Sequence, residues 1–312
     1  MKVKERIRYW ALCGVAYPLS LLPLRGHYVF SDILAFFAGR VVKYRRRVLD
    51  RNLSESFPDM PRGERRRLEK EFYRWLCDYF FETLKLLTMS ERQLRRRLVI
   101  ENQEMLDEAL LEGRSVVMYL GHYANWEWVS ALPLVLPRES VPSQAYHPLK
   151  NKWMDAFMKR IRTRFGANNV PMKEIGLRLL KWKRAGKACV TGLIADQYPG
   201  LTMHHFCNFL NHPDTYVITG PERLARVMDA RVVYVHMERT KRGYYRMRYQ
   251  LITDRPKEEP LFALTDRYFE LLEANIRENP AHWLWTHKRW KRTRAEYEAR
   301  WGDKTSEMLS HL

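Results

Sequence analysis

Short apolar runs and longer amphipathic segments alternate from residue 115 onward, and this alternation constrains the fold more than any other feature of the sequence. The apolar runs predict strands at residues 115–120, 141–146, 187–195, 231–237 and 245–252. Helical spacing predicts helices at residues 125–135, 150–164, 174–185, 215–228 and 259–278, and a helical region at 40–112. Strands that alternate with helices predict an α/β core in which helices flank a mixed sheet.

The start of the chain joins basic residues to an apolar run. Residues 1–8 are rich in Lys and Arg, and residues 9–24 are mostly apolar but contain Pro18 and Pro23. A second apolar stretch covers residues 33–38. A helix that spans a bilayer needs about 20 apolar residues, so this run is short for that purpose and contains helix breakers. It is compatible with a cleaved signal peptide, with a buried core helix, or with a membrane anchor that spans the bilayer or lies in its interface.

The chain of 312 residues carries 55 basic and 36 acidic side chains, a net charge of +19. Such a field attracts phosphate, anionic lipid headgroups, nucleic acid or an acidic protein, and it does not choose among them. Basic runs at residues 43–47, 65–67 and 95–97 follow the apolar segment, and basic residues beside an apolar segment prefer the cytoplasmic leaflet. Among the three interpretations of the N-terminus we therefore expect a membrane anchor at residues 1–40.

Composition excludes several other classes of protein. Apolar residues make up 46% of the chain, which is enough for a sizeable core and argues against global disorder. The four cysteines lie far apart and form no C-x-x-C pair, so a disulfide framework or a cysteine zinc site is not expected. A reducing compartment is the simpler interpretation.

The strongest chemical signal is the segment Gly-His-Tyr-Ala-Asn-Trp-Glu at residues 121–127, where a predicted strand ends and a predicted helix begins. Functional groups of α/β sheets gather beyond the carboxyl ends of strands. A histidine acts as a general base near neutral pH, and a carboxylate on its other ring nitrogen fixes the tautomer. Residues five apart on an ideal helix are rotated by about 140°, so His122 and Glu127 meet only if His122 lies in the turn before the helix. The strand–turn–helix pattern allows this arrangement, and by itself the spacing is equally typical of a histidine and a glutamate that only lie at a helix start.

Together with Asn125 and Trp126, this pair matches the H-x4-D/E motif and resembles the late acyltransferases of lipid A biosynthesis, within the wider lysophospholipid acyltransferase superfamily. Further segments agree in the same order, namely residues 44–58, 72–85, 146–151, 162–166, 195–197 and 279–290. The resemblance covers about residues 15–292. Its most specific parts are the Asn-Trp-Glu core, the Asp-Gln block and the C-terminal tryptophan block.

The resemblance implies direct transfer from an acyl thioester, normally acyl carrier protein, to a hydroxyl on a hydroxyacyl chain of a lipid A precursor. His122 would take the hydroxyl proton as the oxygen attacks the thioester carbonyl, and Glu127 would orient His122 and stabilise its charge. No cofactor is expected. The implied location is the cytoplasmic face of the cell inner membrane, with an acyltransferase domain at residues 41–295 between the N-terminal anchor and a C-terminal tail at residues 296–312.

Three further residues are candidates for substrate binding. Asn125 belongs to the motif itself. Arg164 is a candidate for stabilising the oxyanion or for binding phosphate, since arginine makes planar bidentate contacts with phosphate oxygens, and a surface arginine at a helix end is the alternative. Asp196, at a predicted strand end, shapes the same cleft or serves as a structural turn residue.

The loop after the Asp-Gln block departs from the family pattern. The family usually has a Phe-Phe-Gly-like turn there, whereas residues 206–215 read FCNFLNHPDT, which leaves the acyl-chain selectivity undefined. Three histidines of this region, His204, His205 and His212, are more typical of a polar loop than of a metal centre, so no metal site is expected.

Two other functions fit parts of the pattern. An acyltransferase that acts on another membrane glycolipid, such as a mannosylated phosphoinositide, would carry the same motif. A basic membrane or nucleic-acid adaptor with a degenerate acyltransferase fold is disfavoured because His122 and Glu127 are both present. Binding of nucleic acid is not expected, since the sequence contains no matching motif.

Overall fold

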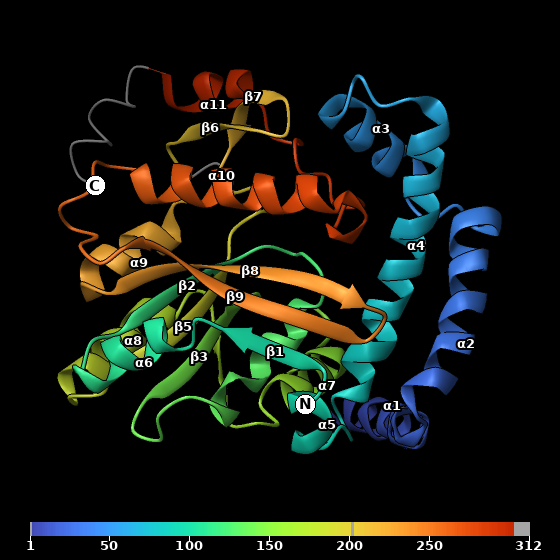
Figure 1. Ribbon diagram of the computed structural model, residues 1–312, viewed down its shortest axis with the longest axis horizontal. Coiled ribbons are helices and arrows are strands. Elements are labelled where there is room, and N and C mark those ends of the chain that lie inside the picture. Colours follow the sequence, from blue (N-terminus) through green and yellow to red (C-terminus); the bar gives the residue numbers. More distant parts are fainter. Residues whose placement is uncertain (1, 201–202, 303–312) are drawn as a thin grey trace.

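In the computed structural model, which describes residues 2–200 and 203–302, a seven-stranded sheet forms the centre of the molecule (Figure 1). Its strands, in spatial order, are β1 (Leu98–Glu101), β9 (Tyr244–Thr253), β8 (Arg231–Lys241), β2 (Val116–Leu120), β5 (Cys189–Ile194), β3 (Val141–Tyr146) and β4 (Asn168–Pro171). Each neighbouring pair runs parallel except β8 and β9, which form an antiparallel hairpin. The predicted α/β fold with a mixed sheet is therefore confirmed.

All five strands predicted from the sequence occur, but the structure contains further short strands. β1 and β4 occupy the two edges of the sheet, and β6 (Phe206–Phe209) and β7 (His212–Tyr216) form a separate hairpin. These strands have four or five residues each, too few to give a clear alternation of apolar and polar positions. β1 lies inside the region 40–112 that the sequence predicts as helical, and β7 takes up the start of the predicted helix 215–228, so both predictions are corrected.

Helices surround the sheet on its faces and at one end. In the described residues they are α1 (Val3–Leu21), α2 (Leu24–Phe36), η1 (Phe37–Val41), α3 (Arg46–Ser56), α4 (Arg62–Lys85), α5 (Glu91–Arg95), α6 (Glu104–Leu111), η2 (Trp126–Leu134), α7 (Lys152–Arg162), α8 (Ile175–Arg184), α9 (Gly220–Met228), α10 (Ala263–Glu278), η3 (Pro280–His282) and α11 (Arg294–Trp301). α9 packs on β2, α10 on β8 and β9, and α8 on β4 and β5. α2 and α4 lie side by side at the end of the molecule opposite α8 and α9 (Figure 1).

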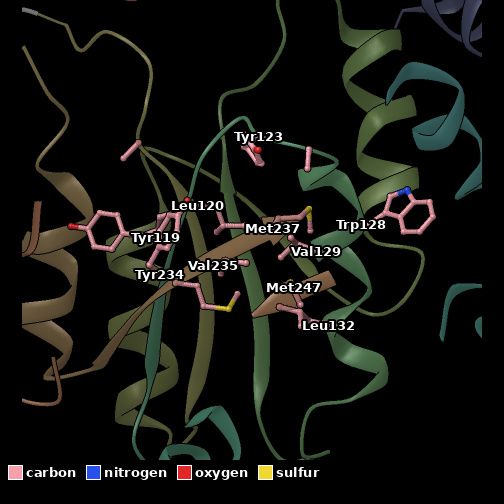
Figure 2. Packing of buried hydrophobic residues seen from close by; sticks show 14 of the residues in the cluster. Tyr119, Leu120, Tyr123, Trp128, Val129, Leu132, Tyr234, Val235, Met237 and Met247 are labelled. Atoms are coloured by element: carbon pink, nitrogen blue, oxygen red, sulfur yellow. The ribbon is translucent and has the colours of Figure 1, made fainter. Parts of the chain in front are cut away.

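Apolar and aromatic side chains of the central strands form the core. All residues of β2 are buried, as expected for a parallel strand that has a neighbour on each side and helices over its faces. Figure 2 shows Tyr119 of β2 in one packed layer with Tyr234 of β8, its register partner. Tyr119 also stacks on Tyr268 of α10, with ring centroids 4.7 Å apart. Burial of such a side chain contributes about 1.5–3 kcal/mol, so this layer holds β2 firmly in its place in the sheet.

The N-terminal segment folds into two helices that are joined at Pro23. α1 contains Pro18, and α2 continues into the short π-helical turn η1. No helix among the described residues has both the length and the apolar character needed to cross a membrane. The spanning form of the anchor predicted at residues 1–40 therefore has no support. At the other end of the chain, α11 occupies the start of the predicted tail, and residues 303–312 lie outside the described residues.

Two buried carboxylates on α4 connect α2 to the β8–β9 hairpin. Asp78 accepts a hydrogen bond from Arg239 at 2.5 Å, and Glu82 accepts one from Tyr28 of α2 at 2.9 Å. Glu82 also accepts a hydrogen bond from Asn125, at 3.0 Å, in the loop that follows β2. Burial raises the pKa of Glu82, and the nearby Arg239 only partly offsets this effect. The network therefore connects the N-terminal helices to the loop that carries the sequence motif.

His282 provides a test of this buried packing. Its side chain is 8% exposed, and burial, assisted by the charge of Arg239, lowers its pKa from 6.5 to about 3. Below about pH 6.5, His282 therefore binds a proton in the unfolded chain but stays neutral in the folded chain. The free energy of unfolding consequently falls as the pH falls. Between about pH 6.5 and about pH 5 we expect the free energy of unfolding of the wild type to fall by about 2 kcal/mol more than that of a His282→Phe variant. Urea unfolding at the two pH values measures this difference, and equal pH dependence in the two proteins would contradict the assignment.

Candidate active site

The strands β2 and β5 are parallel neighbours, and they end at the same edge of the sheet. Their register pairs Leu120 with Ile194, the last residue of each strand. His122 and Asp196 each follow two residues later, so the register brings their side chains together. A histidine from one strand end therefore meets a carboxylate from the next, at the edge of the sheet where α/β proteins place their functional groups.

His122 has a neighbour on each ring nitrogen. Nδ1 lies 2.6 Å from Asp196 Oδ1, and Nε2 lies 3.3 Å from the side-chain nitrogen of Gln197. A carboxylate accepts a proton and an amide nitrogen donates one, so the contacts assign the ring proton to Nδ1 and a lone pair to Nε2. The His122 side chain is 20% exposed. A partly exposed imidazole whose other nitrogen is held by a carboxylate has the geometry of a general base.

Asp196 is an almost fully buried carboxylate that several donors hold in place. Its side chain is 1% exposed. Oδ2 accepts hydrogen bonds from the backbone N–H of His122 at 2.8 Å and from the indole N–H of Trp283 at 2.7 Å. Burial by itself raises the pKa of this carboxyl, but the charge of His122 and these hydrogen bonds outweigh it and lower the pKa of Asp196 below its usual value. Asp196 is therefore an anion that can stabilise a protonated His122.

The histidine loop, residues 121–125, is shaped by close packing and by a left-handed turn. A Cβ atom on Gly121 would lie 2.6 Å from a leucine side chain of α10, so a larger residue would force a shift. Ala124 has a φ of +50°, which reverses the direction of the chain. The Ala124 N–H donates to the carbonyl of His282 at 2.8 Å, and the Leu284 N–H donates to the carbonyl of His122 at 3.2 Å. The C-terminal tryptophan block therefore pairs directly with the histidine loop.

Glu127 lies in the first turn of η2, as predicted, but its main partner is Arg162 of α7. Arg162 donates hydrogen bonds to the two Glu127 oxygens at 2.6 and 2.8 Å. Tyr79 of α4 donates to the same carboxylate at 3.3 Å. In the described part of the chain the hydrogen bonds of the Glu127 carboxylate go to these two side chains, and Asp196 occupies Nδ1 of His122. The expected hydrogen bond between Glu127 and His122 is therefore wrong, whereas the catalytic roles of the two residues stay predictions.

Local geometry explains this correction. η2 is a 3₁₀-helix that begins just after the left-handed Ala124, so Glu127 points in a different direction from the one an α-helix would give it. The ring of Trp126 contacts both sides of the site, with its centroid 5.0 Å from that of His122 and 4.2 Å from that of Tyr79. Glu127 and His122 consequently belong to two adjoining clusters that share this tryptophan.

Asn125 and Arg164, two of the predicted substrate-binding residues, bind neighbouring parts of the protein. Arg164 Nη1 donates to the carbonyls of Leu86 and Met89 at 2.5 and 2.6 Å, in the turn that follows α4. Asn125 is fully buried and donates to Glu82. These contacts give both residues structural roles, and their contacts with substrate stay predictions. The third candidate, Asp196, lies in the site itself.

Arg162, Gln197 and Trp283 belong to the site without an individual signal in the sequence, although each lies in a segment that carries the resemblance. Arg162 is the last residue of α7 and faces Glu127, whereas Arg164 lies in the turn beyond the helix and binds the segment after α4. Residue spacing does not show where the helix ends, so it does not decide which of the two arginines faces Glu127. A tryptophan such as Trp283 is most often core, so its hydrogen bond to a carboxylate is visible only in the fold.

The three histidines of the following loop have separate neighbours. His204 Nδ1 lies 2.8 Å from the hydroxyl of Tyr297, and His205 Nε2 lies 2.6 Å from a carboxylate oxygen of Asp266. The ring of His212 stacks on a tryptophan ring with centroids 3.8 Å apart. Over residues 2–200 and 203–302, no group of three potential metal ligands is found.

Comparison with known proteins places this geometry in a family. The sequence model of the family described as bacterial lipid A biosynthesis acyltransferase matches residues 2–292. No match is found among individually curated proteins. The matched residues include both strand ends of the site and the tryptophan block that pairs with the histidine loop. The match covers nearly the whole chain, and the protein therefore belongs to the bacterial lipid A biosynthesis acyltransferases.

Proposed function

We propose that the protein transfers a fatty acyl group from the thioester of acyl carrier protein to a hydroxyl of a lipid A precursor, with His122 as the general base. The observation that carries the proposal is the contact of His122 Nδ1 with Asp196 at 2.6 Å, which places the lone pair of the ring on Nε2, the nitrogen that Gln197 contacts at 3.3 Å. Family membership supports the reaction class and the acceptor. The net charge of +19 supports docking of an acidic carrier protein, since complementary charge speeds encounter.

In the proposed reaction, His122 Nε2 takes the proton of the acceptor hydroxyl while the hydroxyl oxygen attacks the thioester carbon. The resulting tetrahedral intermediate carries its negative charge on the former carbonyl oxygen. When it collapses, the C–S bond breaks and the departing thiolate takes the proton from the His122 imidazolium. The acyl group passes directly to the acceptor oxygen, so no acyl-enzyme forms. Asp196 stabilises the imidazolium between the two proton transfers.

The Glu127–Arg162 pair supports the reaction in a different way. The Glu127 side chain is 2% exposed and that of Arg162 is 23% exposed, so the arginine occupies the more open side of the pair. We assign to Arg162 the stabilisation of the oxyanion, the role that the sequence suggests for Arg164. Glu127 holds the guanidinium with two hydrogen bonds, a geometry that restricts its orientation. Glu127 is thus a positioning residue for Arg162.

An apolar face on α2 and η1 supports a location at the membrane. Its side chains are 44–59% exposed, and they are Ile33, Leu34, Phe36, Phe37 and Val41. A continuous exposed patch of such residues is typical of a surface that contacts a partner or a membrane. Basic residues follow directly at residues 43–47. We propose that α2 and η1 lie in the interface of the cytoplasmic leaflet of the inner membrane, with their basic flank on anionic headgroups.

Removing the base or its carboxylate tests the reaction. His122→Ala deletes the proton acceptor, and Asp196→Asn deletes the charge that stabilises the imidazolium. We expect transfer of labelled acyl groups from acyl carrier protein to a lipid A precursor to fall by about 10²–10⁴-fold in each variant, since this is the usual contribution of a general base.

A mannosylated phosphoinositide acceptor, tested with the same labelled donor, serves as the control for acceptor class, and we expect no transfer to it. In cells that lack the protein, mass spectrometry of lipid A is expected to show one missing secondary acyl chain. Undiminished lipid A acylation by His122→Ala in the assay and in cells would refute the proposal.

Substitution of Glu127 should act on stability as well as on activity. Glu127→Gln leaves the guanidinium of Arg162 without its anionic partner, so we expect the free energy of unfolding to fall by about 2–4 kcal/mol. Glu139→Gln, at an exposed acidic residue beyond η2, is the matched control and should change it by less than about 0.5 kcal/mol. Chemical denaturation in detergent measures both. A fully stable Glu127→Gln protein would show that the ion pair does not hold this region together.

Membrane binding depends, on this proposal, on the apolar face of α2 and η1. Replacing Ile33 and Phe37 by Ser should weaken binding to anionic vesicles by about 2 kcal/mol, or roughly thirtyfold, because half-exposed apolar groups lose their lipid contacts. Leu111→Ser with Leu177→Ser removes two exposed leucines from α6 and α8 and serves as the control. Vesicle flotation measures the partition, and equal binding by the two double variants would disprove the assignment of this face.

A further inference from the structure

A basic hollow lies between the turn that follows η1 and the start of α4. We call it the α3–α4 hollow; its volume is about 790 Å³, and seven cationic side chains and two carboxylates line it. A cavity of this size is within the range that holds a small ligand. Its cations come from two segments, residues 43–47 and residues 62–66, which the fold brings together. The charge of the hollow favours an anion.

Most of this positive charge has no partner in the protein. Of the two carboxylates, Glu69 is paired with Arg46 at 2.8 Å. Within the described residues, the side chains of Arg47, Arg62 and Arg66 take part in no hydrogen bond or ion pair. Guanidinium groups that are gathered in a concave site without internal partners are available to an anionic ligand, and they bind phosphate oxygens in a bidentate manner.

The backbone that carries the hollow is held in an unusual conformation. Lys43 and Arg45 both have positive φ values, +52° and +49°, which residues with side chains rarely adopt. The hydroxyl of Tyr73, on α4, donates to the carbonyl of Tyr44 at 2.7 Å and so fixes the turn between Lys43 and Arg45. Strained backbone of this kind occurs where side chains must be presented in a fixed arrangement. The backbone that carries Lys43 and Arg45 is therefore fixed before any ligand arrives.

The hollow lies between the C-terminal tryptophan block and the apolar face of α2 and η1. On one side, Arg45 donates to the carbonyl of Thr286 at 3.1 Å, in the block whose Trp283 holds Asp196. On the other side, a second hollow of about 650 Å³ shares Arg46 with the first and includes Phe36 of the apolar face. A ligand in the hollow would therefore lie beside the apolar face and next to the C-terminal block that supports Asp196.

We propose that the α3–α4 hollow binds the phosphomonoester of a membrane lipid headgroup. A phosphomonoester carries a charge of about −1.5 to −2 near neutral pH and three acceptor oxygens, which suits several free guanidinium groups. The adjoining Phe36 and the apolar face favour a lipid over a protein partner. The inference deepens the proposed function, on which it rests for the identity of the lipid: the hollow would hold the phosphate of the acceptor while its hydroxyl reaches His122.

Vesicle binding tests the site without any reaction. The full-length protein is mixed with phosphatidylcholine vesicles that contain either phosphatidic acid, a phosphomonoester, or phosphatidylglycerol, a phosphodiester, at matched surface charge. We expect the wild type to prefer phosphatidic acid by about tenfold, which matches one additional charged contact. The triple variant Arg47→Gln, Arg62→Gln, Arg66→Gln is expected to lose this preference.

A matched control separates the hollow from the general positive field. Arg178→Gln, Arg184→Gln, Arg223→Gln removes three exposed arginines from α8 and α9, which lie at the opposite end of the molecule (Figure 1). This variant loses the same charge and should keep the preference for phosphatidic acid. Equal loss in the two triple variants would overturn the proposal, because the preference would then depend on net charge alone.

Two further arms identify the source of the phosphate and the class of partner. Inorganic phosphate that binds the wild type and abolishes the preference at low concentration would show a free-phosphate site and overturn the assignment to lipid. Weaker binding of acyl carrier protein by the Arg47, Arg62, Arg66 variant, with an unchanged lipid preference, would assign the hollow to the carrier.

In acylation assays the variant should raise KM for a phosphorylated acceptor by about tenfold without lowering kcat. If the wild type prefers phosphatidic acid vesicles but transfers no acyl group, the proposed function is rejected and the proposed phosphate site is retained.

Discussion

The hydrogen bond between His122 and Asp196 is the interaction on which the rest of the site depends. It exists because two neighbouring parallel strands end in the same register, so that residues equally distant from their ends face each other. The packed layer around Tyr119 fixes that register from within the core. Trp283 then fixes the buried oxygen of Asp196. The chemistry of one imidazole thus depends on the sheet, the core and the C-terminal block together.

The site separates two carboxylates that the local sequence does not distinguish. Asp196 faces a histidine and Glu127 faces an arginine, so one carboxylate supports a proton carrier and the other supports a fixed positive charge. Environment assigns the role of each carboxylate, as in other enzymes that use pairs of acidic groups. Trp126 keeps the two clusters adjoining, and its contacts with both rings explain why a bulky aromatic residue stands between the histidine and Glu127.

Local patterns in the sequence predict the central strands, the flanking helices and the position of the histidine at a strand end. They fail where the outcome depends on contacts between distant segments. The pairing of β2 with β5 is not encoded in the spacing around residues 121–127, so that spacing predicts Glu127 as the partner of His122, whereas the partner is Asp196. The end of α7 likewise separates Arg162, which faces Glu127, from Arg164 in the turn beyond it. The edge strands β1 and β4 are too short for a period to appear, and the composition of the N-terminus does not decide between a spanning helix and an interfacial one.

The pairing of the histidine loop with residues 282–284 has a consequence for how the protein is made. Backbone hydrogen bonds from His282 and Leu284 complete the loop that carries His122. The indole of Trp283 completes the set of donors to Asp196. On the proposed mechanism, a nascent chain on the ribosome would therefore hold its histidine without the surroundings that make it a base. The histidine would gain that role only after translation has released the tryptophan block, and a chain truncated before residue 282 would lack the completed site.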